Sequence, residues 1–345
     1  MGIRIRDIAE KLKLSSATVS LALNNRRGVS EEVRGKVLSA ARNMGYSKAP
    51  PHRGISETDA IQLLIFKQSA AEQLDTSFFT RMAEGIDSTL SAAHYRLMIT
   101  YVTAGSDIPA RLESIRSSGV RGIILLATEL SSAYVSSFLT LDLPMVVLDG
   151  YFEELPMDFV TINNVQGAFA ATAYLGGAGH REIGYLTSRV RTVNFSERHE
   201  GYNKALKKLG LTKKAEYTLR LSPALDSAYF DMLAYLDSGI KLPTAFFADN
   251  DILAAGAIRA LKERDYHIPG DISVVGFDDI PLCRLLSPEL TTVSVPKKRL
   301  GVLAVERLLA RINGDTSEYV KIEIGTQIII RGSSAPSQAR EKADG

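Results

Sequence analysis

The sequence predicts a small all-α head that contains a helix-turn-helix, followed by a larger α/β body built around parallel sheets. A length of 345 residues exceeds that of one typical domain and indicates two or three. Within the first 50 residues, apolar side chains recur with the period of an α-helix. Beyond residue 60, short apolar runs alternate with amphipathic stretches, which is typical of alternating strands and helices.

The composition argues against several classes of protein. A single cysteine, Cys283, rules out a disulfide framework within the chain and fits a reducing compartment such as the cytoplasm. No signal-peptide pattern opens the sequence, and no apolar stretch is long enough to span a membrane. The five histidines are scattered without metal-ligand spacing, so we expect neither a metal nor a cofactor.

Charge is distributed unevenly along the chain. Residues 1–48 hold ten Lys and Arg against four Asp and Glu, a net charge of +6, whereas the whole chain carries +2. The remainder is therefore mildly acidic, at −4. A basic head on an acidic body suggests that the head meets a polyanion such as nucleic acid. A solvated charged surface is the alternative explanation.

Three short helices are predicted in the head. The first has one apolar face at positions i, i+3, i+4 and i+7: Ile5, Ile8, Ala9 and Leu12. Ser15 is a good N-cap for the second, over residues 16–24, and the short gap between the two is typical of a helix-turn-helix. The third follows Ser30 and ends near Gly45.

The second helix has two distinct faces. Val19, Ala22 and Leu23 lie together and must face the core, so Ala17 and Leu21 point outward with Ser20 beside them. In a helix-turn-helix that outward face enters the major groove of DNA. Short hydroxyls suited to phosphate oxygens accompany it: Ser15, Thr18 and Ser20. A three-helix domain that binds protein is the alternative.

The head resembles that of the lactose/galactose repressor (LacI/GalR) family. The shared motifs are Ile5-Arg6-Asp7-Ile8-Ala9, Ser15-Ser16-Ala17-Thr18-Val19-Ser20, Leu23-Asn24, Val29-Ser30 and Gly45-Tyr46. The resemblance implies a set of DNA-contacting residues: Arg4, Arg6, Ser15, Ser16, Ala17, Thr18, Ser20, Leu21, Asn24 and Ile55. Leu21 stands where the family usually has a guanine-reading arginine, and Arg4 where it usually has threonine, so we expect an altered half-site.

The segment 47–60 has the composition of a linker, with Pro50, Pro51 and Gly54 among polar residues. In the family this segment forms a hinge helix on DNA and wedges an apolar side chain into the minor groove. Ile55 falls at the position of that wedge. Gly54 weakens a helix by roughly 1 kcal/mol, so a hinge helix and a flexible tether both remain open.

Strands alternate with helices in the body. The predicted strands are 61–66, 97–102, 122–127, 145–148, 183–186, 245–248 and 273–277; the clearest helices are 80–93, 165–176 and 252–264. Near-continuous apolar strands with helices between them indicate parallel sheets covered on both faces. Ligands of such sheets bind beyond the carboxyl ends of the strands.

Polar and aromatic side chains occupy the loops at those ends. They are Phe78, Phe79, Asp149, Arg189, Arg191, Phe195, Asn250 and Asp278. Arg198 lies four residues before Tyr202, on the inward face of its helix, where an arginine needs an anion or a polar ligand. A structural ion pair with Asp278 is the alternative for Arg198, and core packing is the alternative for each aromatic residue.

The resemblance to the same family extends over the body, to about Gly314. It rests on residues 77–85, 197–202, 244–251, 274–279 and 290–293. It implies two doubly wound α/β subdomains that close on a ligand, as in periplasmic sugar-binding proteins. It also implies that Asp149, Arg198, Asn250 and Asp278 bind ligand hydroxyls, that Lys297 lines the cleft, and that the chain is a homodimer on a pseudo-palindromic operator.

The family pattern divides the chain into five parts. We expect a helix-turn-helix domain at 1–47, a linker at 48–60, a first subdomain at 61–160 and 293–318, a second at 161–292 and 319–334, and a disordered tail at 335–345. The tail contains no leucine heptad, so we do not expect a tetramerising coiled coil there.

The resulting functional prediction is a DNA-binding repressor controlled by a sugar-like effector. No nucleophile elbow, phosphate loop or pair of catalytic carboxylates appears, and the glycine-rich run at 176–179 follows a helix rather than a strand, so we do not expect an enzyme. A transport-type solute-binding protein is the alternative, but the basic head argues against it.

The charge of the effector remains open at this stage. If Arg189, Arg191 and Lys297 enter the cleft beside Arg198, the nearby aspartates balance only part of the charge, which favours a sugar acid or sugar phosphate. If Arg189 and Arg191 point to solvent, a neutral sugar suffices.

Overall fold

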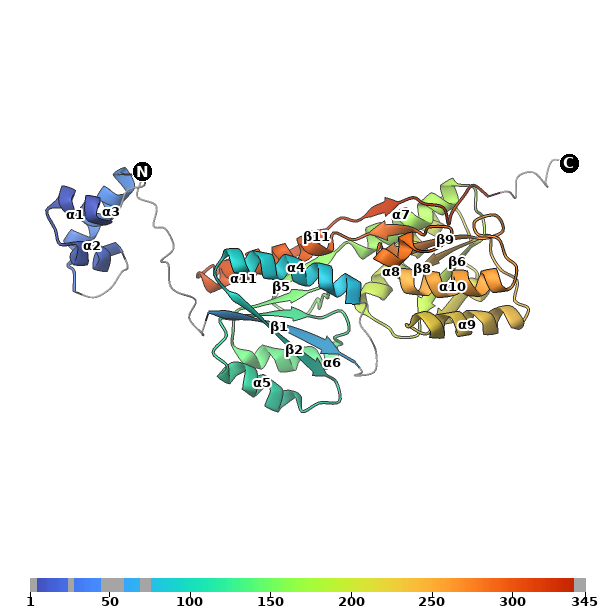
Figure 1. Cartoon of the computed structure of the whole chain (residues 1–345), viewed down its shortest axis with the longest axis horizontal. Helices are drawn as coiled ribbons and strands as arrows, with labels where there is room; N and C mark the ends of the chain where they lie inside the picture. The colour runs from blue at the N-terminus through green and yellow to red at the C-terminus, as the bar shows by residue number, and fades with distance from the viewer. Residues whose placement is uncertain (1–4, 24–27, 45–58, 69–75, 338–345) are drawn as a thin grey trace. The chain divides into compact units, whose positions relative to one another are not determined.

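The computed structural model describes residues 5–23, 28–44, 59–68 and 76–337. The chain divides into two compact units, residues 1–56 and 57–345, and each is described by itself (Figure 1). The predictions for Arg4, Asn24, Ile55 and a hinge helix lie outside the described residues.

The head contains the three predicted helices. They are α1 (Ile5–Leu12), α2 (Ser16–Leu23) and α3 (Glu31–Asn43). Ser15 caps α2, because its Oγ accepts a hydrogen bond from the Thr18 amide at 3.0 Å. The apolar faces of the three helices meet in a small core of Ile8, Val19 and Val37, each fully buried. The sequence prediction of a helix-turn-helix is therefore confirmed.

The body contains two six-stranded sheets, each covered by helices. The first sheet is parallel and has the order β11-β5-β4-β3-β1-β2, with β1 (Ala60–Lys67), β2 (Arg96–Thr103), β3 (Gly122–Leu126), β4 (Met145–Leu148), β5 (Asp158–Ile162) and β11 (Lys321–Ile324). Its helices are α4 (Thr76–Ala92), α5 (Ile108–Ser117), α6 (Ser132–Phe138) and α11 (Lys297–Ile312). This sheet and these helices are called the first lobe.

The second sheet has the order β12-β10-β9-β8-β6-β7 and is parallel except for its antiparallel edge strand β12. Its strands are β6 (Ile183–Ser188), β7 (Thr218–Leu221), β8 (Ala245–Ala248), β9 (Ser273–Asp278), β10 (Thr291–Ser294) and β12 (Gln327–Ile329). Its helices are α7 (Asn164–Gly177), α8 (Val193–Leu209), α9 (Leu225–Asp237) and α10 (Asp251–Glu263). Together they form the second lobe.

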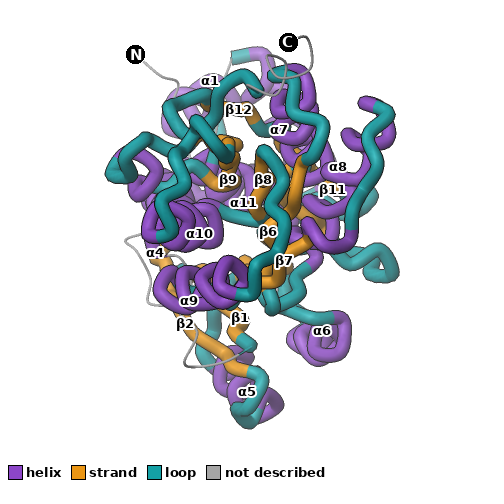
Figure 2. The backbone as a smooth tube through the Cα atoms, turned by 90° about the vertical axis from the view of Figure 1, so that its right-hand side faces the viewer, coloured by secondary structure: helices purple, strands orange, loops and turns teal. Residues whose placement is uncertain are grey.

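Alternating strand residues bury opposite faces of each sheet. In β8, Phe247 packs in one core with residues of α7 and α8, whereas Phe246 packs in another with residues of α9 and α10. Figure 2 shows α9 and α10 on one side of this sheet and α7 and α8 on the other. In β1, Leu63 joins the core beneath α4 and α11, whereas Leu64 faces α5 and α6. Both lobes are therefore three-layered, as the near-continuous apolar strands predict.

The chain passes between the lobes three times, from β5 to α7, from β10 to α11, and from β11 to β12. One predicted boundary needs correction here, because residues 321–324 form β11 beside β5 in the first sheet, not in the second subdomain. The physical reason is a partner far away in the sequence, since the Val320 amide donates a hydrogen bond to Asp158 Oδ1 at 2.9 Å.

The start of the predicted tail is also ordered. The Ala335 amide donates to Ser273 Oγ at 3.1 Å, and the Ser337 amide donates to the Ala178 carbonyl at 2.8 Å. His180, only 3% exposed, places its Nε2 at 3.1 Å from the Ala335 carbonyl oxygen. Hydrogen bonds of their backbone groups thus hold residues 335–337 although their side chains are small.

Candidate functional site

A cavity of about 680 Å³ lies between the lobes, at the carboxyl ends of their strands. Its lining from the first lobe includes Phe78, Phe79, Thr128 and Asp149. Its lining from the second lobe includes Ser188, Asn194, Phe195, Arg198, Asn250 and Asp278. The loops after parallel strands converge there, and seven of the nine residues predicted for the effector site line this cavity.

Arg198 is the most tightly held charged group of the cavity. Its side chain is 4% exposed, and Nη2 donates to Asp278 Oδ1 at 3.1 Å. Nε donates to Asn164 Oδ1 at 2.9 Å, and Nη1 donates to the Asp249 carbonyl at 2.5 Å. The ion pair with Asp278 is therefore present. Of the five N–H donors of the guanidinium, three bind other described residues, and two remain for a ligand.

Aromatic rings flank the Arg198 guanidinium. Its carbon lies 3.7 Å from the centroid of the Phe277 ring and 5.5 Å from that of Phe195. Stacking on Phe277 fixes the plane of the guanidinium, since that ring is fully buried. The cavity therefore presents a preoriented donor group beside an aromatic surface.

Asp149 is the corresponding acceptor of the first lobe. It follows β4 with φ of +57°, a left-handed conformation that aims its carboxylate into the cavity wall. Thr128 Oγ1 donates to its Oδ2 at 2.6 Å, and Asn194 Nδ2 donates to its Oδ1 at 3.1 Å. Burial raises the pKa of Asp149 to about 6, although the hydrogen bonds from Thr128 and Asn194 oppose that rise.

The turn after β8 contains Asn250, whose side-chain amide caps α10. Asn250 Oδ1 accepts the Leu253 amide at 3.0 Å and caps α10, and Asn250 lines the cavity. Its neighbour Asp249 is fully buried and binds Tyr185, Thr187 Oγ1 at 2.8 Å and the Ser188 amide at 2.8 Å. Burial raises the pKa of Asp249 to about 6. Asp249 thus holds the turn that presents Asn250.

Two arginines of the loop after β6 lie outside the cavity lining. Arg189 is exposed and binds Asp231, with Nε and Nη2 each 3.2 Å from a carboxylate oxygen. Side chains alternate along a strand, so the buried Ser188 at the end of β6 faces the cavity while Arg189 faces away. Arg191 is likewise exposed and does not line the cavity.

Lys297, which was also predicted to line the cleft, lies outside the cavity lining. Its side chain is buried, but its ammonium donates to the backbone carbonyls of Asp278 and Asp279 instead of lining the cavity. A partnership with backbone oxygens leaves no trace in the sequence, which explains why the cleft was the expected place for this residue.

Sequence reasoning missed several polar residues of the cavity, among them Thr128 and Asn194. Thr128 follows β3, so the rule that selected Asp149 after β4 would also have selected it. Asn194 lies in the first turn of α8, one residue before the predicted Phe195, and is 5% exposed. The sequence signal that could have identified Asn194 is its place in the first turn of α8, on the inward face of that helix.

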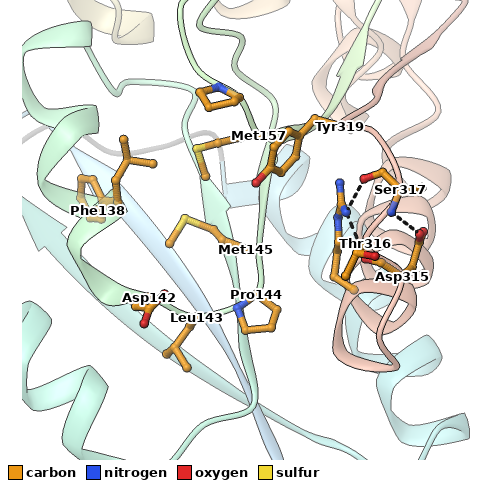
Figure 3. Close-up of a pocket in the computed structure, with 13 residues that line it drawn as sticks. Phe138, Asp142, Leu143, Pro144, Met145, Met157, Asp315, Thr316, Ser317 and Tyr319 are labelled. Atoms are coloured by element: carbon orange, nitrogen blue, oxygen red, sulfur yellow. Dashed lines mark hydrogen bonds between the residues drawn. The ribbon is translucent and has the colours of Figure 1, made fainter.

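A second cavity of about 630 Å³ lies at the opposite, amino edge of the first sheet. Figure 3 shows Met145, Met157 and Tyr319 around it, with Asp142 and Asp315 on opposite sides. Arg311 braces one wall, because its Nε binds the buried Asp158 at 2.6 Å. No residue predicted for the effector site lines this second cavity.

The described part of the head presents the predicted polar side chains on its surface. Arg6, Ser15 and Ser16 are exposed, and Thr18, Ser20 and Leu21 are half-buried. Ser15 Oγ also lies 2.8 Å from Thr18 Oγ1, so this pair starts α2 as one unit. Ala17 lies in α2 between them.

No helix in the described ranges combines the length and apolar character needed to cross a membrane. Within the same ranges, no group of three or more His, Cys, Asp or Glu side chains is arranged to hold a metal ion.

Family comparison matches both units. Residues 4–48 match the family described as bacterial regulatory proteins, lacI family, and residues 172–334 match a periplasmic binding protein-like domain. The ribose operon repressor of Haemophilus influenzae is 31% identical over 334 residues, covering 95% of this chain and 98% of the relative. The HTH-type transcriptional repressor PurR of Histophilus somni is 31% identical over 338 residues, with the same two coverages.

Two solved structures extend this similarity to three dimensions. A complex of the transcriptional regulator CelR with cellobiose has a TM-score of 0.72 and 25% identity, covering 96% of this chain and 100% of that one. A LacI family regulator from Enterococcus faecium with bound ribose has a TM-score of 0.68 and 25% identity, covering 80% of this chain and 100% of that one.

Proposed function

Because the chain belongs to the lacI family of bacterial regulatory proteins, we propose that it is a transcriptional repressor whose affinity for operator DNA is set by a sugar-like effector bound between the two lobes. The observation that carries the proposal is Arg198, a buried guanidinium held by Asp278 and Asn164 on the wall of the cavity between the lobes.

The lining favours a neutral sugar over its acid or phosphate. The charged residues that line the cavity, within the described part of the chain, are Arg198, Glu129, Asp149 and Asp278. One cation against three acids gives no excess of positive charge, and Arg189 is paired on the surface instead. An anionic ligand would therefore meet repulsion, whereas hydroxyl groups suit the donors of Arg198 and the acceptors of Asp149.

Aromatic side chains in the lining support the same ligand class. Phe78, Phe79 and Phe195 offer flat apolar surfaces, and sugar rings expose apolar C–H faces beside their hydroxyls. A cavity of about 680 Å³ is within the usual range for small-molecule sites. The CelR and Enterococcus faecium structures hold cellobiose and ribose, so these two neutral sugars are the first candidates.

The DNA-binding part of the proposal rests on the head. Its net charge of +6 and its helix-turn-helix suit a DNA duplex, and heads of this kind read two half-sites as dimers. We therefore infer a homodimer on a pseudo-palindromic operator. The chain would act in the cytoplasm, where operator DNA is found, and would regulate transcription without catalysing a reaction.

A transport-type solute-binding protein remains the alternative with a different class of function. It shares the two-lobed body but has no use for a basic helix-turn-helix head. The deciding experiment selects DNA fragments with the full-length chain and then measures their release by ribose and cellobiose in a gel shift. Sequence-specific binding that a neutral sugar alters supports the repressor; sugar binding without any sequence-specific DNA binding supports the alternative.

A further inference from the structure

Lys297 occupies an unusual position for a lysine. It is the first residue of α11, where the positive end of the helix dipole disfavours a cation, and the N-cap Pro296 makes no side-chain capping bond. Its side chain is nevertheless buried, with 8% of the residue exposed. A buried cation in that place must be compensated by specific partners.

The partners of Lys297 come from both lobes. Its ammonium donates to the carbonyl oxygens of Asp278 and, at 3.2 Å, of Asp279, which end β9 in the second lobe. The same nitrogen lies 5.4 Å from the centroid of the Phe78 ring, in α4 of the first lobe. Phe78 and Asp278 both line the cavity, so Lys297 supports one wall of it in each lobe.

The first-lobe side of this arrangement is rigid. Helices α4 and α11 approach so closely that a Cβ added at Gly85 would stand 2.1 Å from the Lys298 carbonyl oxygen, and one at Gly301 would stand 2.3 Å from that of Met82. Glycine at these two positions permits the contact of the two backbones. Phe78 and Lys297, near the starts of the two helices, therefore move as one body.

The second-lobe side is a strained turn. Asp278 and Asp279 have φ of +110° and +54°, a backbone conformation that is strained for residues with a side chain. Three cations hold this turn: Arg198 binds the Asp278 carboxylate, Arg331 binds the Asp279 carboxylate at 2.6 Å, and Lys297 binds both carbonyls. Of the three, Lys297 is the one that extends from the first lobe.

We propose that Lys297 is a positioning residue that holds the Asp278–Asp279 turn in its strained conformation and ties that turn to the first lobe. In this role it presents the Asp278 carboxylate to the effector without touching the effector. The part that concerns the effector rests on the proposed function; the part that concerns the turn and the lobes does not. Relative movement of the lobes must displace Lys297 from the two carbonyls or carry the turn with it.

The test compares Lys297→Met with Lys298→Met in the full-length protein. Methionine has an unbranched side chain that is one atom shorter than that of lysine and has no N–H donor. Lys298 is the exposed neighbour on the same helix. Hydrogen exchange is read at the Ile280 amide, which donates to Asp251 Oδ2 at 3.0 Å directly after the turn. We expect about tenfold faster exchange in Lys297→Met and wild-type exchange in Lys298→Met.

The coupling of the lobes is measured by spin labels on two exposed serines, Ser117 in the first lobe and Ser238 in the second, each changed to cysteine. The native Cys283 is fully buried and does not compete for the label. We expect the distance distribution to broaden in Lys297→Met and not in Lys298→Met. Equal behaviour of the two variants in both measurements overturns the proposal.

A conservative variant separates charge from packing. Lys297→Arg retains a cation with N–H donors and is expected to keep most of the protection that Lys297→Met loses. Equal loss in both variants assigns the effect to packing and overturns the proposal. If Lys297→Met does not fold, Lys297→Gln replaces it, because its amide is one bond shorter than the ammonium and does not reach both carbonyls.

Ribose and cellobiose serve as probes in a final calorimetric comparison. Lys297→Met is expected to weaken whichever sugar binds the wild type by about tenfold or more. If neither sugar binds the wild type, the assigned ligand class fails, while the exchange and distance measurements on the ligand-free protein still decide the role of Lys297.

Discussion

Asn194 in the second lobe donates its side-chain amide to the carboxylate of Asp149 in the first lobe, at 3.1 Å to Oδ1. Asn194 is 5% exposed and Asp149 is 1% exposed, so this hydrogen bond crosses between the lobes away from bulk water. It opposes the effect of burial, which raises the pKa of Asp149 to about 6. Effector binding at this carboxylate is therefore expected to depend on pH.

The first prediction concerns that pH dependence. Because the pKa of Asp149 is about 6, its carboxylate is ionised at pH 7 and largely protonated at pH 5. An ionised carboxylate accepts hydrogen bonds from sugar hydroxyls, so we expect affinity to fall as the pH drops through about 6. Calorimetry at pH 5, 6 and 7 checks this. Asp149→Asn should bind weakly with little pH dependence; persistence of the full dependence would assign it to another group such as Asp249.

The second prediction compares two arginines. Arg198→Ala removes the guanidinium from the cavity and breaks its ion pair with Asp278, so we expect at least about a hundredfold loss of effector affinity, in line with a buried charge pair. Arg189→Ala is the matched control, because Arg189 binds Asp231 outside the cavity, and its affinity should stay within about twofold of wild type. Calorimetry with the effector sugar checks both variants. Full affinity in Arg198→Ala would show that the effector binds elsewhere.

The third prediction separates the two units. Deletion of residues 1–48 should abolish operator binding yet leave the body folded and able to bind sugar, because the body has its own core. Gel shifts and thermal unfolding with sugar check the two halves of this statement. For the intact protein, operator affinity should fall steeply with salt, since phosphate contacts release counterions. Specific operator binding by the truncated body would contradict the assignment of the head.

The fourth prediction concerns sequence readout. Leu21 lies in α2 and is apolar, so it can contact a thymine methyl but cannot hydrogen-bond to a base edge. Leu21→Arg is expected to shift the preferred half-site towards guanine, with discrimination of about 1–3 kcal/mol at that position. Selection from a randomised operator library checks the change. An unchanged preference would remove Leu21 from the DNA interface.

The fifth prediction concerns stability. Asp158 is fully buried and is bound by Arg307 at 2.9 Å and by Arg311 at 2.6 Å. Arg311→Met removes one partner and the donors that hold the carbonyls of Asp315 and Ser317, so we expect a loss of about 3 kcal/mol in the free energy of unfolding. Urea denaturation checks it. Arg299→Met, on the exposed part of the same helix, should change stability by less than about 1 kcal/mol.

The strands that the sequence predicts are those with continuous apolar character, such as β3 and β8, because both of their faces are buried. The strands that it misses are short or mixed. β11 reads Lys-Ile-Glu-Ile with alternating exposure at the edge of its sheet, and β7 carries an exposed Arg220. Their positions depend on partners far away in the sequence, such as Asp158, which local patterning does not contain.

The candidate site follows the same division. Asp149 and Asn250 were predicted because they follow parallel strands, and the family resemblance implied the same two residues. Arg189 was misplaced because the exact end of β6 decides which neighbouring side chain faces the cavity. Lys297 was misplaced because its acceptors are backbone carbonyls, which every residue possesses. Sequence thus predicts the loops of a site better than the direction of each side chain.

The three passages of the chain between the lobes have a consequence for synthesis on the ribosome. The head can fold as soon as its residues emerge, since its core is formed within residues 8–41. The first sheet is incomplete until β11, residues 321–324, has left the exit tunnel, and α11, which covers that sheet, also comes late. The first lobe therefore cannot finish folding before most of the second has been translated, and a nascent chain carries a finished DNA-binding head ahead of an unfinished sensor.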